Sequence, residues 1–226
     1  MILSTLMDSR PMFDTFAALL DWFGIVIFAT TGALVASRKQ MDIVGFVLLG
    51  TATGIGGGTI RDTLINALPV FWVREPAYLV TCILVSCAAF FLAHIPQSRL
   101  KLLLWFDAVG MALFAVTGAE KALLAETAPI VAVAMGVITA TFGGIVRDIL
   151  GGESPVILSR EIYVSAALGG AAIFVALAFV GISREYALAS GFLAAFAIRA
   201  AALRWDWSLP RYKPRPGRTR DEIETR

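Results

Sequence analysis

Seven apolar stretches divide this chain, and each is long enough to cross a lipid bilayer as a helix. A membrane-spanning helix needs about 20 mostly apolar residues, because it rises only about 1.5 Å per residue. With that length as the criterion, the stretches lie near residues 16–36, 43–66, 76–95, 102–124, 128–150, 160–182 and 185–204. Charged residues, glycine and proline mark the breaks between them. The sequence therefore predicts a multi-pass membrane protein.

The composition excludes the other classes of chain. Apolar residues make up 58% of the 226 residues, charged residues only 16%, and the mean hydropathy is +0.78. A soluble domain of this size cannot bury so much apolar surface, and a disordered chain has the opposite balance of charge and hydrophobicity. A transmembrane barrel has short alternating strands instead of long apolar runs. The fold class we predict is all-α and integral to the membrane.

An internal repeat adds a constraint on topology. When the chain is compared with itself at an offset of 86 residues, 20 of the 55 positions from 21 to 75 are identical. Compositional bias explains matched Ala and Gly but not the charged and proline matches, which are Asp21 with Asp107, Arg61-Asp62 with Arg147-Asp148, Pro69 with Pro155, and Arg74-Glu75 with Arg160-Glu161. Each copy holds three spans, an odd number, so the second copy enters the membrane from the opposite face. We predict two inverted three-helix repeats followed by a seventh transmembrane helix.

This arrangement sets the expected boundaries and orientation. The segments are an N-terminal segment 1–15 without a secretory signal, the repeats 16–95 and 102–182 joined by a linker 96–101, the seventh helix 183–204, and a basic tail 205–226. Residues 199–226 carry eight basic and four acidic side chains, which favours a cytoplasmic C-terminus and an outside N-terminus in the cell inner (plasma) membrane. Nucleic-acid binding is a poor explanation for that tail. Outer loops are then expected to hold Arg74, Lys121 and Arg184, each beside a glutamate.

Glycine-rich segments occupy matching positions in the second span of each repeat. Glycine inside a helix costs about 1 kcal/mol relative to alanine, so these segments should loosen or kink their helices and free backbone carbonyls. Such paired interruptions indicate a permeation or binding site, where threonine hydroxyls could replace part of a cation's hydration shell. The residues are Gly56, Gly57, Gly58, Thr53 and Thr59 in the first copy, and Gly143, Gly144, Thr139 and Thr141 in the second. The alternative is close packing through the small-residue ladders that begin at Gly50 and Gly136.

Charged residues within or at the ends of the spans are the other candidates. Charges are costly in a bilayer and indicate function by default, although an interfacial position is the alternative for Asp62 and Asp148. We expect Arg61 and Arg147 to line the pore or to gate it. The inverted topology places Asp21 level with Arg61 and Asp107 level with Arg147. This predicts two charge pairs, either direct or bridged by water, that brace the pore mouths. Asp62 and Asp148 should point about 100° away from these arginines around the helix.

No other chemistry is indicated. Cys82 and Cys87 match neither a CxxC nor a zinc motif, and His94 is the single histidine, so we expect no metal site beyond transient potassium, no catalytic residues and no cofactor.

At residues 16–204, the paired glycine segments followed by Arg-Asp resemble a prokaryotic member of the trimeric intracellular cation (TRIC) channel family. The resemblance implies a homotrimer in membrane lipids, with one hourglass pore per subunit. Kinked second and fifth helices would line that pore and conduct monovalent cations, chiefly potassium. The first glycine motif of the family falls on Gly56-Gly57-Gly58, whereas the second departs from the pattern because Phe142 replaces its first glycine. Phosphoinositide regulation, known in animal members, is not expected to carry over.

We therefore predict a potassium-conducting channel and not an enzyme. A secondary transporter of a small solute such as glycine is the first alternative, because inverted repeats with broken helices also support alternating access. A membrane enzyme or an assembly scaffold is a third, weaker interpretation. A transporter should have an asymmetric substrate site, whereas this sequence offers nearly symmetric Thr, Gly and Arg pairs.

Overall fold

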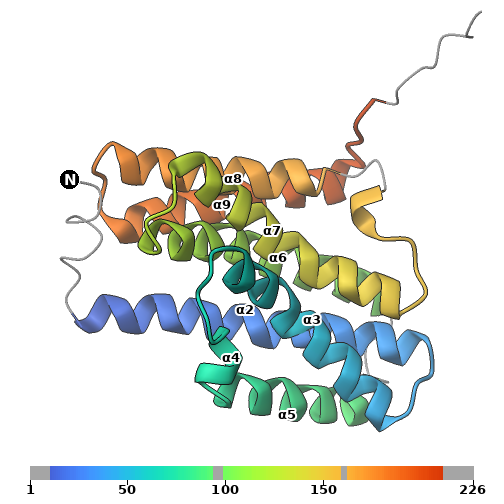
Figure 1. The fold of residues 1–226 in the computed structure, drawn as a ribbon. Coiled ribbons are helices and arrows are strands. Elements are labelled where there is room, and N and C mark those ends of the chain that lie inside the picture. The colour runs from blue at the N-terminus through green and yellow to red at the C-terminus, as the bar shows by residue number, and fades with distance from the viewer. Residues whose placement is uncertain (1–10, 94–98, 159–161, 211–226) are drawn as a thin grey trace, which may run out of the picture.

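The computed structural model of the chain describes residues 11–93, 99–158 and 162–210, and every regular element in these ranges is helical (Figure 1). The elements are α2 (Pro11–Arg38), α3 (Ile43–Leu64), α4 (Phe71–Arg74), α5 (Ala77–Leu92), α6 (Arg99–Leu124), α7 (Pro129–Leu150), the 3₁₀ turn η1 (Val156–Leu158), α8 (Val164–Phe179) and α9 (Arg184–Trp205). The predicted all-α class is confirmed.

Five of these helices are long and apolar enough to cross a membrane. They are Ala18–Arg38, Ile43–Leu64, Leu100–Leu124, Pro129–Leu150 and Arg184–Trp205. The third and sixth expected spans are apolar helices of 16 residues each, α5 and α8, and are shorter than the sequence suggested. α5 begins only after Pro76 and α8 only after Tyr163, and residues 94–98 and 159–161, where both expected spans continue, lie outside the described residues.

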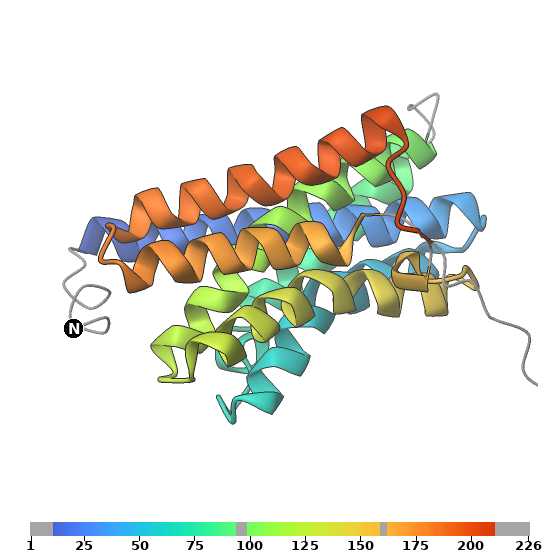
Figure 2. The ribbon, with the colours of Figure 1, turned by 90° about the horizontal axis from the view of Figure 1, so that it is seen from above.

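The helices form two groups of three with one further helix on the outside (Figures 1 and 2). α5 packs on α2 and α3, and α8 packs in the same way on α6 and α7. α2 also packs on α6, and α3 on α7, so elements related by the offset of 86 residues touch one another. α9 lies along α6 and α8. The two groups therefore meet through corresponding helices.

The helix ends repeat as well. After α3, the amide of Ala67 donates to the carbonyl of Asp62, and after α7 the amide of Glu153 donates to that of Asp148, both at 2.8 Å. The residue just before each donating amide has a left-handed backbone conformation, with φ of 56° at Asn66 and 65° at Gly152. Asparagine and glycine tolerate this conformation best, so both copies carry a suitable residue at their helix ends.

The contact between α2 and α6 is reciprocal. A Cβ atom on Gly24 would lie 2.6 Å from the Phe114 ring, and one on Gly110 would lie 2.9 Å from the Phe28 ring. The two rings themselves pack with centroids 5.0 Å apart. Each phenylalanine thus fills the space that the other helix's glycine leaves open, and this interlock fixes the helices that flank the α3–α7 crossing.

Candidate functional site

α3 and α7 cross at backbone contact distance, through four of the residues that the sequence singled out. A Cβ atom on Gly57 would lie 2.2 Å from the carbonyl oxygen of Thr139, and one on Gly143 would lie 2.6 Å from that of Thr53. Both distances are too short for any side chain, so this crossing requires glycine at both positions. Gly56 is different, because a Cβ there would have no atom closer than 3.8 Å.

Both glycine segments remain helical. α3 and α7 are continuous α-helices through them, so the expectation that glycines free backbone carbonyls at this point is wrong for this conformation. The hydroxyls of Thr53, Thr59, Thr139 and Thr141 each donate to the carbonyl four residues earlier, at 2.6–2.8 Å. The close approach of the facing helix explains Gly57 and Gly143 without unwinding.

The packing alternative is confirmed for the small-residue ladders. A Cβ on Gly50 would collide with the Ser86 hydroxyl at 2.0 Å, and one on Gly136 with the carbonyl of Ala115 at 2.4 Å. These ladder faces point toward α2 and α5 in the first copy and toward α6 and α8 in the second. The glycines on the α3–α7 face are a separate set.

Arg147 joins three helices in a buried cluster. Its guanidinium Nη1 donates to Asp107 Oδ1 at 2.5 Å and to Thr31 Oγ1 at 3.2 Å, while Nε donates to Asp148 Oδ1 at 2.9 Å. The predicted Asp107–Arg147 pair is confirmed. The expectation that Asp148 points away from Arg147 is wrong, because the long arginine side chain folds back onto its neighbour.

Further contacts close the Arg147 cluster. The second carboxylate oxygen of Asp148 accepts a hydrogen bond from the amide of Val156 at 3.0 Å. Gly144 leaves room for the cluster, because a Cβ there would lie 3.2 Å from the Tyr163 hydroxyl and 3.5 Å from the Arg147 guanidinium. Both Arg147 and Asp107 are about 1% exposed, so the cluster excludes solvent.

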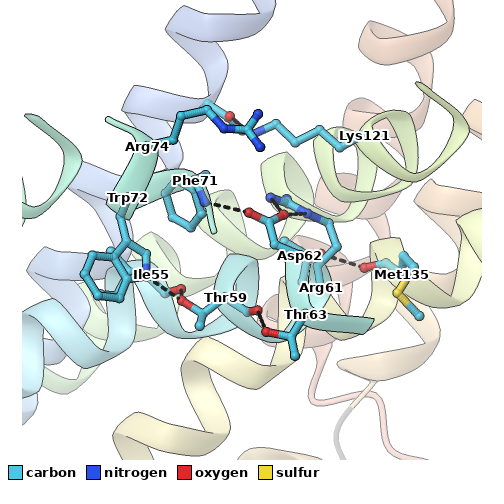
Figure 3. Close-up of polar contacts among 12 residues, drawn as sticks. Ile55, Thr59, Arg61, Asp62, Thr63, Phe71, Trp72, Arg74, Lys121 and Met135 are labelled. Carbon is cyan, nitrogen blue, oxygen red and sulfur yellow. Dashed lines mark hydrogen bonds and ion pairs between the residues drawn. The ribbon is translucent and has the colours of Figure 1, made fainter. Parts of the chain in front are cut away.

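The matching cluster around Arg61 is arranged differently (Figure 3). Arg61 donates to Asp62 Oδ1 through Nη2 at 2.6 Å and Nε at 2.9 Å, and Asp62 Oδ2 accepts from the Phe71 amide at 2.8 Å. Asp21 is bonded instead to the ammonium of Lys121. The predicted Asp21–Arg61 pair is therefore not a direct ion pair in this structure, although both side chains line the same cavity. Lys121 binds the Asp21 carboxylate. Its counterpart in the first repeat is the buried Val35, which cannot compete with Arg147 for Asp107.

Sequence reasoning missed several charged partners. Lys121 lies within α6 and Arg184 begins α9, so neither belongs to an outer loop as expected. Arg184 pairs with the buried Glu120. The sequence did contain a signal for these pairs, because the charged Glu120 and Lys121 stand where the first repeat has the apolar Leu34 and Val35.

Two adjoining cavities lie on the Arg61 side. The inner cavity measures about 10 Å³, which is room for about one water molecule, and is lined by Asp21, Gly54, Gly58 and Thr139, among others. The outer cavity, which we call the vestibule, measures about 260 Å³ and is lined by Asp62, Arg74 and Ala125, among others. Arg61, Phe71 and Lys121 line both. The two cavities share these three residues and lie in succession between the end of α3 and the α3–α7 crossing.

Known structures share this fold. The chain is 65% identical to the TRIC trimeric intracellular cation channel orthologue from Rhodobacter sphaeroides, over 85% of this chain and 100% of that one, with a TM-score of 0.84. A structure that addresses conductance through TRIC cation channels is 36% identical over 88% of this chain and 98% of that one, with a TM-score of 0.79. A prokaryotic TRIC channel solved in 0.5 M KCl is 31% identical over 86% of this chain and 99% of that one, with a TM-score of 0.80.

Sequence relatives are membrane proteins. A UPF0126 membrane protein of Vibrio cholerae is 40% identical over 91% of this chain and 87% of its own length. The UPF0126 inner membrane protein YadS of Escherichia coli K12 is 42% identical over 85% and 94%, respectively. The family model described as "Glycine transporter" matches residues 18–94 and 104–179, two blocks whose starts lie 86 residues apart.

The fold and the charged route into its helical crossing define a multi-pass membrane protein of the cation channel class. The chain belongs to the family that the "Glycine transporter" model describes, and its fold and sequence identity place it among the TRIC channels, which confirms the resemblance found in the sequence.

Proposed function

We propose that the protein conducts monovalent cations, chiefly potassium, through a pathway between α3 and α7 of each subunit. The observation that carries this proposal is the route formed by the two cavities, which reaches Thr139 at the crossing. A polar, charged route into the middle of an apolar helix bundle is costly in a membrane and indicates transport. No enzymatic activity is proposed.

The proposed pathway has one open and one closed half. Thr53 and Thr139 stand at the crossing, with Gly57 and Gly143 beside them. Gly56, Gly58, Gly144, Thr59 and Thr141, which the sequence also singled out, lie on the same two helices and are proposed to contribute to the pathway. Threonine oxygens that donate to their own helix keep lone pairs free to accept, so they can contact a passing cation. The charge clusters of Arg61 and Arg147, with Asp21, Asp62, Asp107 and Asp148, are the proposed gating elements.

We propose the inverted seven-helix topology and its boundaries as predicted from the sequence. The reciprocal contacts support a two-fold relation between the copies, because Gly57 meets Thr139 while Gly143 meets Thr53. A two-fold axis in the membrane plane produces contacts of this kind and inverts one copy relative to the other. The repeats would then end with α5 and α8, and α9 would be the seventh span.

We further propose a homotrimer in the inner membrane, surrounded by lipid, with the N-terminus outside and the basic C-terminal tail in the cytoplasm. The related Rhodobacter sphaeroides protein is described as trimeric, and the Escherichia coli relative as an inner membrane protein. Exposed apolar side chains such as Val44, Leu48 and Leu84 suit contact with lipid or with other subunits.

Glycine transport is the second candidate, supported by the name of the matching family model. The charges around the inner cavity favour it in one respect, because Asp21, Lys121 and Arg61 present both signs of charge to a zwitterion, and the cavity would have to widen to admit glycine. A transporter must close each half in turn around its substrate. The one-sided cavity is compatible with that cycle.

One pair of measurements decides between the candidates. Purified protein in a planar bilayer with unequal KCl solutions should give unitary currents that reverse near the potassium equilibrium potential. The same preparation in vesicles should take up little labelled glycine. Saturable glycine uptake without unitary currents would replace the channel proposal with the transporter one.

A further inference from the structure

We propose that the Phe71 ring is the barrier between the vestibule and the inner cavity, and that α4 must shift before an ion can pass. The proposal rests on the conduction pathway described above. It assigns the outer constriction to a residue on a one-turn helix that follows the Arg-Asp segment and not to the glycine segment.

The position of the ring carries the inference. Phe71 lines the inner cavity and the vestibule, so it stands at their junction. The ring rests on Gly58, where a Cβ atom would lie 2.7 Å from its edge. The Arg61 guanidinium lies 6.0 Å from the ring centroid and the Lys121 ammonium 5.7 Å, and the Tyr78 ring packs edge-on at 5.1 Å.

These neighbours make the position of the Phe71 ring, between the inner cavity and the vestibule, unfavourable for an ion. A dehydrating cation would meet an apolar ring edge, and the nearby carboxylates of Asp62 and Asp21 are already bonded to Arg61 and Lys121. The ion would lose water there while the carboxylates that could replace it are engaged. The same two cations are attracted to the ring, which holds them together with Phe71. The contacts that keep the ring in place also keep the cations beside it.

Two hydrogen bonds fix α4 to α3 (Figure 3). The Phe71 amide donates to Asp62 Oδ2 at 2.8 Å, and the Trp72 indole Nε1 donates to Thr59 Oγ1 at 2.9 Å. The Asp62 carboxylate that holds Arg61 thus also holds the backbone of the barrier. A change in the Arg61–Asp62 pair would be transmitted directly to Phe71.

The second repeat has the backbone contact but not the barrier. Asp148 accepts from the Val156 amide, yet the residues that correspond to Phe71, Trp72 and Thr59 are Ile157, Leu158 and Ile145. Ile157 is 39% exposed, whereas Phe71 is partly buried between cations. Ile157 therefore provides a matched control position.

Thiol accessibility tests the barrier without requiring conduction. In a background with Cys82→Ser and Cys87→Ser, the substitution Thr139→Cys places a thiol on the inner cavity of the detergent-solubilised full-length protein. Its reaction with a charged methanethiosulfonate should be about tenfold faster with Phe71→Ala, because lost ring contacts of this kind shift such an equilibrium by roughly that factor. Ile157→Ala should leave the rate unchanged. Equal rates with and without the Phe71 ring would overturn the proposal.

Conduction provides a second, independent measurement. Phe71→Ala should raise open probability or unitary current in a KCl bilayer by about tenfold, Phe71→Leu by less, and Trp72→Phe slightly, because it removes only the indole donor. Trp72→Phe retains the ring packing and serves if Phe71→Ala fails to assemble. If the unsubstituted protein conducts nothing, the channel proposal fails, and the thiol rates alone decide the barrier.

Discussion

The Arg147 and Arg61 clusters share an Arg-Asp segment and the same hydrogen-bond pattern at the end of the helix. They differ in their contacts, because only the Arg61 cluster lines the inner cavity and the vestibule. Arg147 binds Asp107, Asp148 and Thr31, which come from three helices, and it is almost fully buried. Arg61 binds its neighbour Asp62, while Asp21 is bonded to Lys121, and two cavities adjoin this cluster. The same Arg-Asp motif therefore forms a buried ion-pair cluster in the second repeat and lines two cavities in the first.

The difference traces to a few positions where the repeats diverge. Val35 leaves the Arg147 cluster without a competing cation, whereas its counterpart Lys121 draws Asp21 away from Arg61. Phe71 adds an aromatic ring where the second copy has Ile157. Residues that are identical in the two repeats thus specify the shared helix packing. Residues that differ between the repeats specify the different surroundings of Arg61 and Arg147.

The largest expected effect comes from Arg147→Gln. It leaves Asp107 and Asp148 buried without a counter-charge, and removal of one partner from a buried ion pair costs about 3–5 kcal/mol. Arg61→Gln should cost clearly less, because only Asp62 loses its partner and the adjoining cavity can admit water. The free energy of unfolding of the detergent-solubilised protein, measured with denaturant, compares the two. Equal losses would contradict the distinction between the halves.

Gly57→Ala and Gly143→Ala should each cost about 1–3 kcal/mol, because the added methyl overlaps a backbone carbonyl of the facing helix. Equal costs are expected, since the contacts are reciprocal. Gly56→Ala is the matched control, because a Cβ there would make only ordinary van der Waals contacts at 3.8 Å or more, and it should stabilise the helix by up to about 1 kcal/mol. Thermal unfolding of the three variants gives the comparison. A loss at Gly56 as large as at Gly57 would refute the crossing geometry.

Double-mutant cycles should separate the two aspartates. For Asp107→Asn with Arg147→Gln, the interaction energy should be about 1–3 kcal/mol, as for residues in direct contact. For Asp21→Asn with Arg61→Gln it should stay below about 0.5 kcal/mol, because Asp21 is bonded to Lys121. The readouts are unfolding free energy and open probability. Additive effects at Asp107 and Arg147 would exclude the bracing role.

The smallest effect sharpens the comparison. Lys121→Val makes the first cluster resemble the second, and Asp21 should then turn to Arg61. The cycle between Asp21 and Arg61 should gain an interaction energy of about 1 kcal/mol in this background. A cycle that stays additive without Lys121 would show that distance, and not competition, keeps Asp21 from Arg61.

Part of the site was predictable because the repeat places residues at matching depths. The offset of 86 residues identified Thr53, Thr139, Gly57 and Gly143 as counterparts, and these four meet at the crossing. Depth alone also predicted the Asp107–Arg147 pair. It failed for Asp21, because matching depth does not reveal which of two cations, Lys121 or Arg61, is nearer to a carboxylate.

Other expectations failed because they treated each helix in isolation. Glycine segments weaken an isolated helix, but here the opposing helix packs against them, and both helices remain continuous. Asp62 and Asp148 were expected to point away from Arg61 and Arg147, because successive residues are rotated by about 100° around a helix. A long guanidinium side chain spans that rotation and reaches Asp62 and Asp148.

The sequence by itself determined the membrane class, the helical fold, the repeat and the positions that need glycine, because apolar length, periodic identity and the absence of a side chain are properties of the chain. Only the tertiary structure decided which charges pair, that α4 places Phe71 between the two cavities, and that the Arg147 cluster is buried while cavities adjoin Arg61. Those outcomes depend on side chains from separate helices competing for the same space and the same partners. No local pattern in the sequence records that competition.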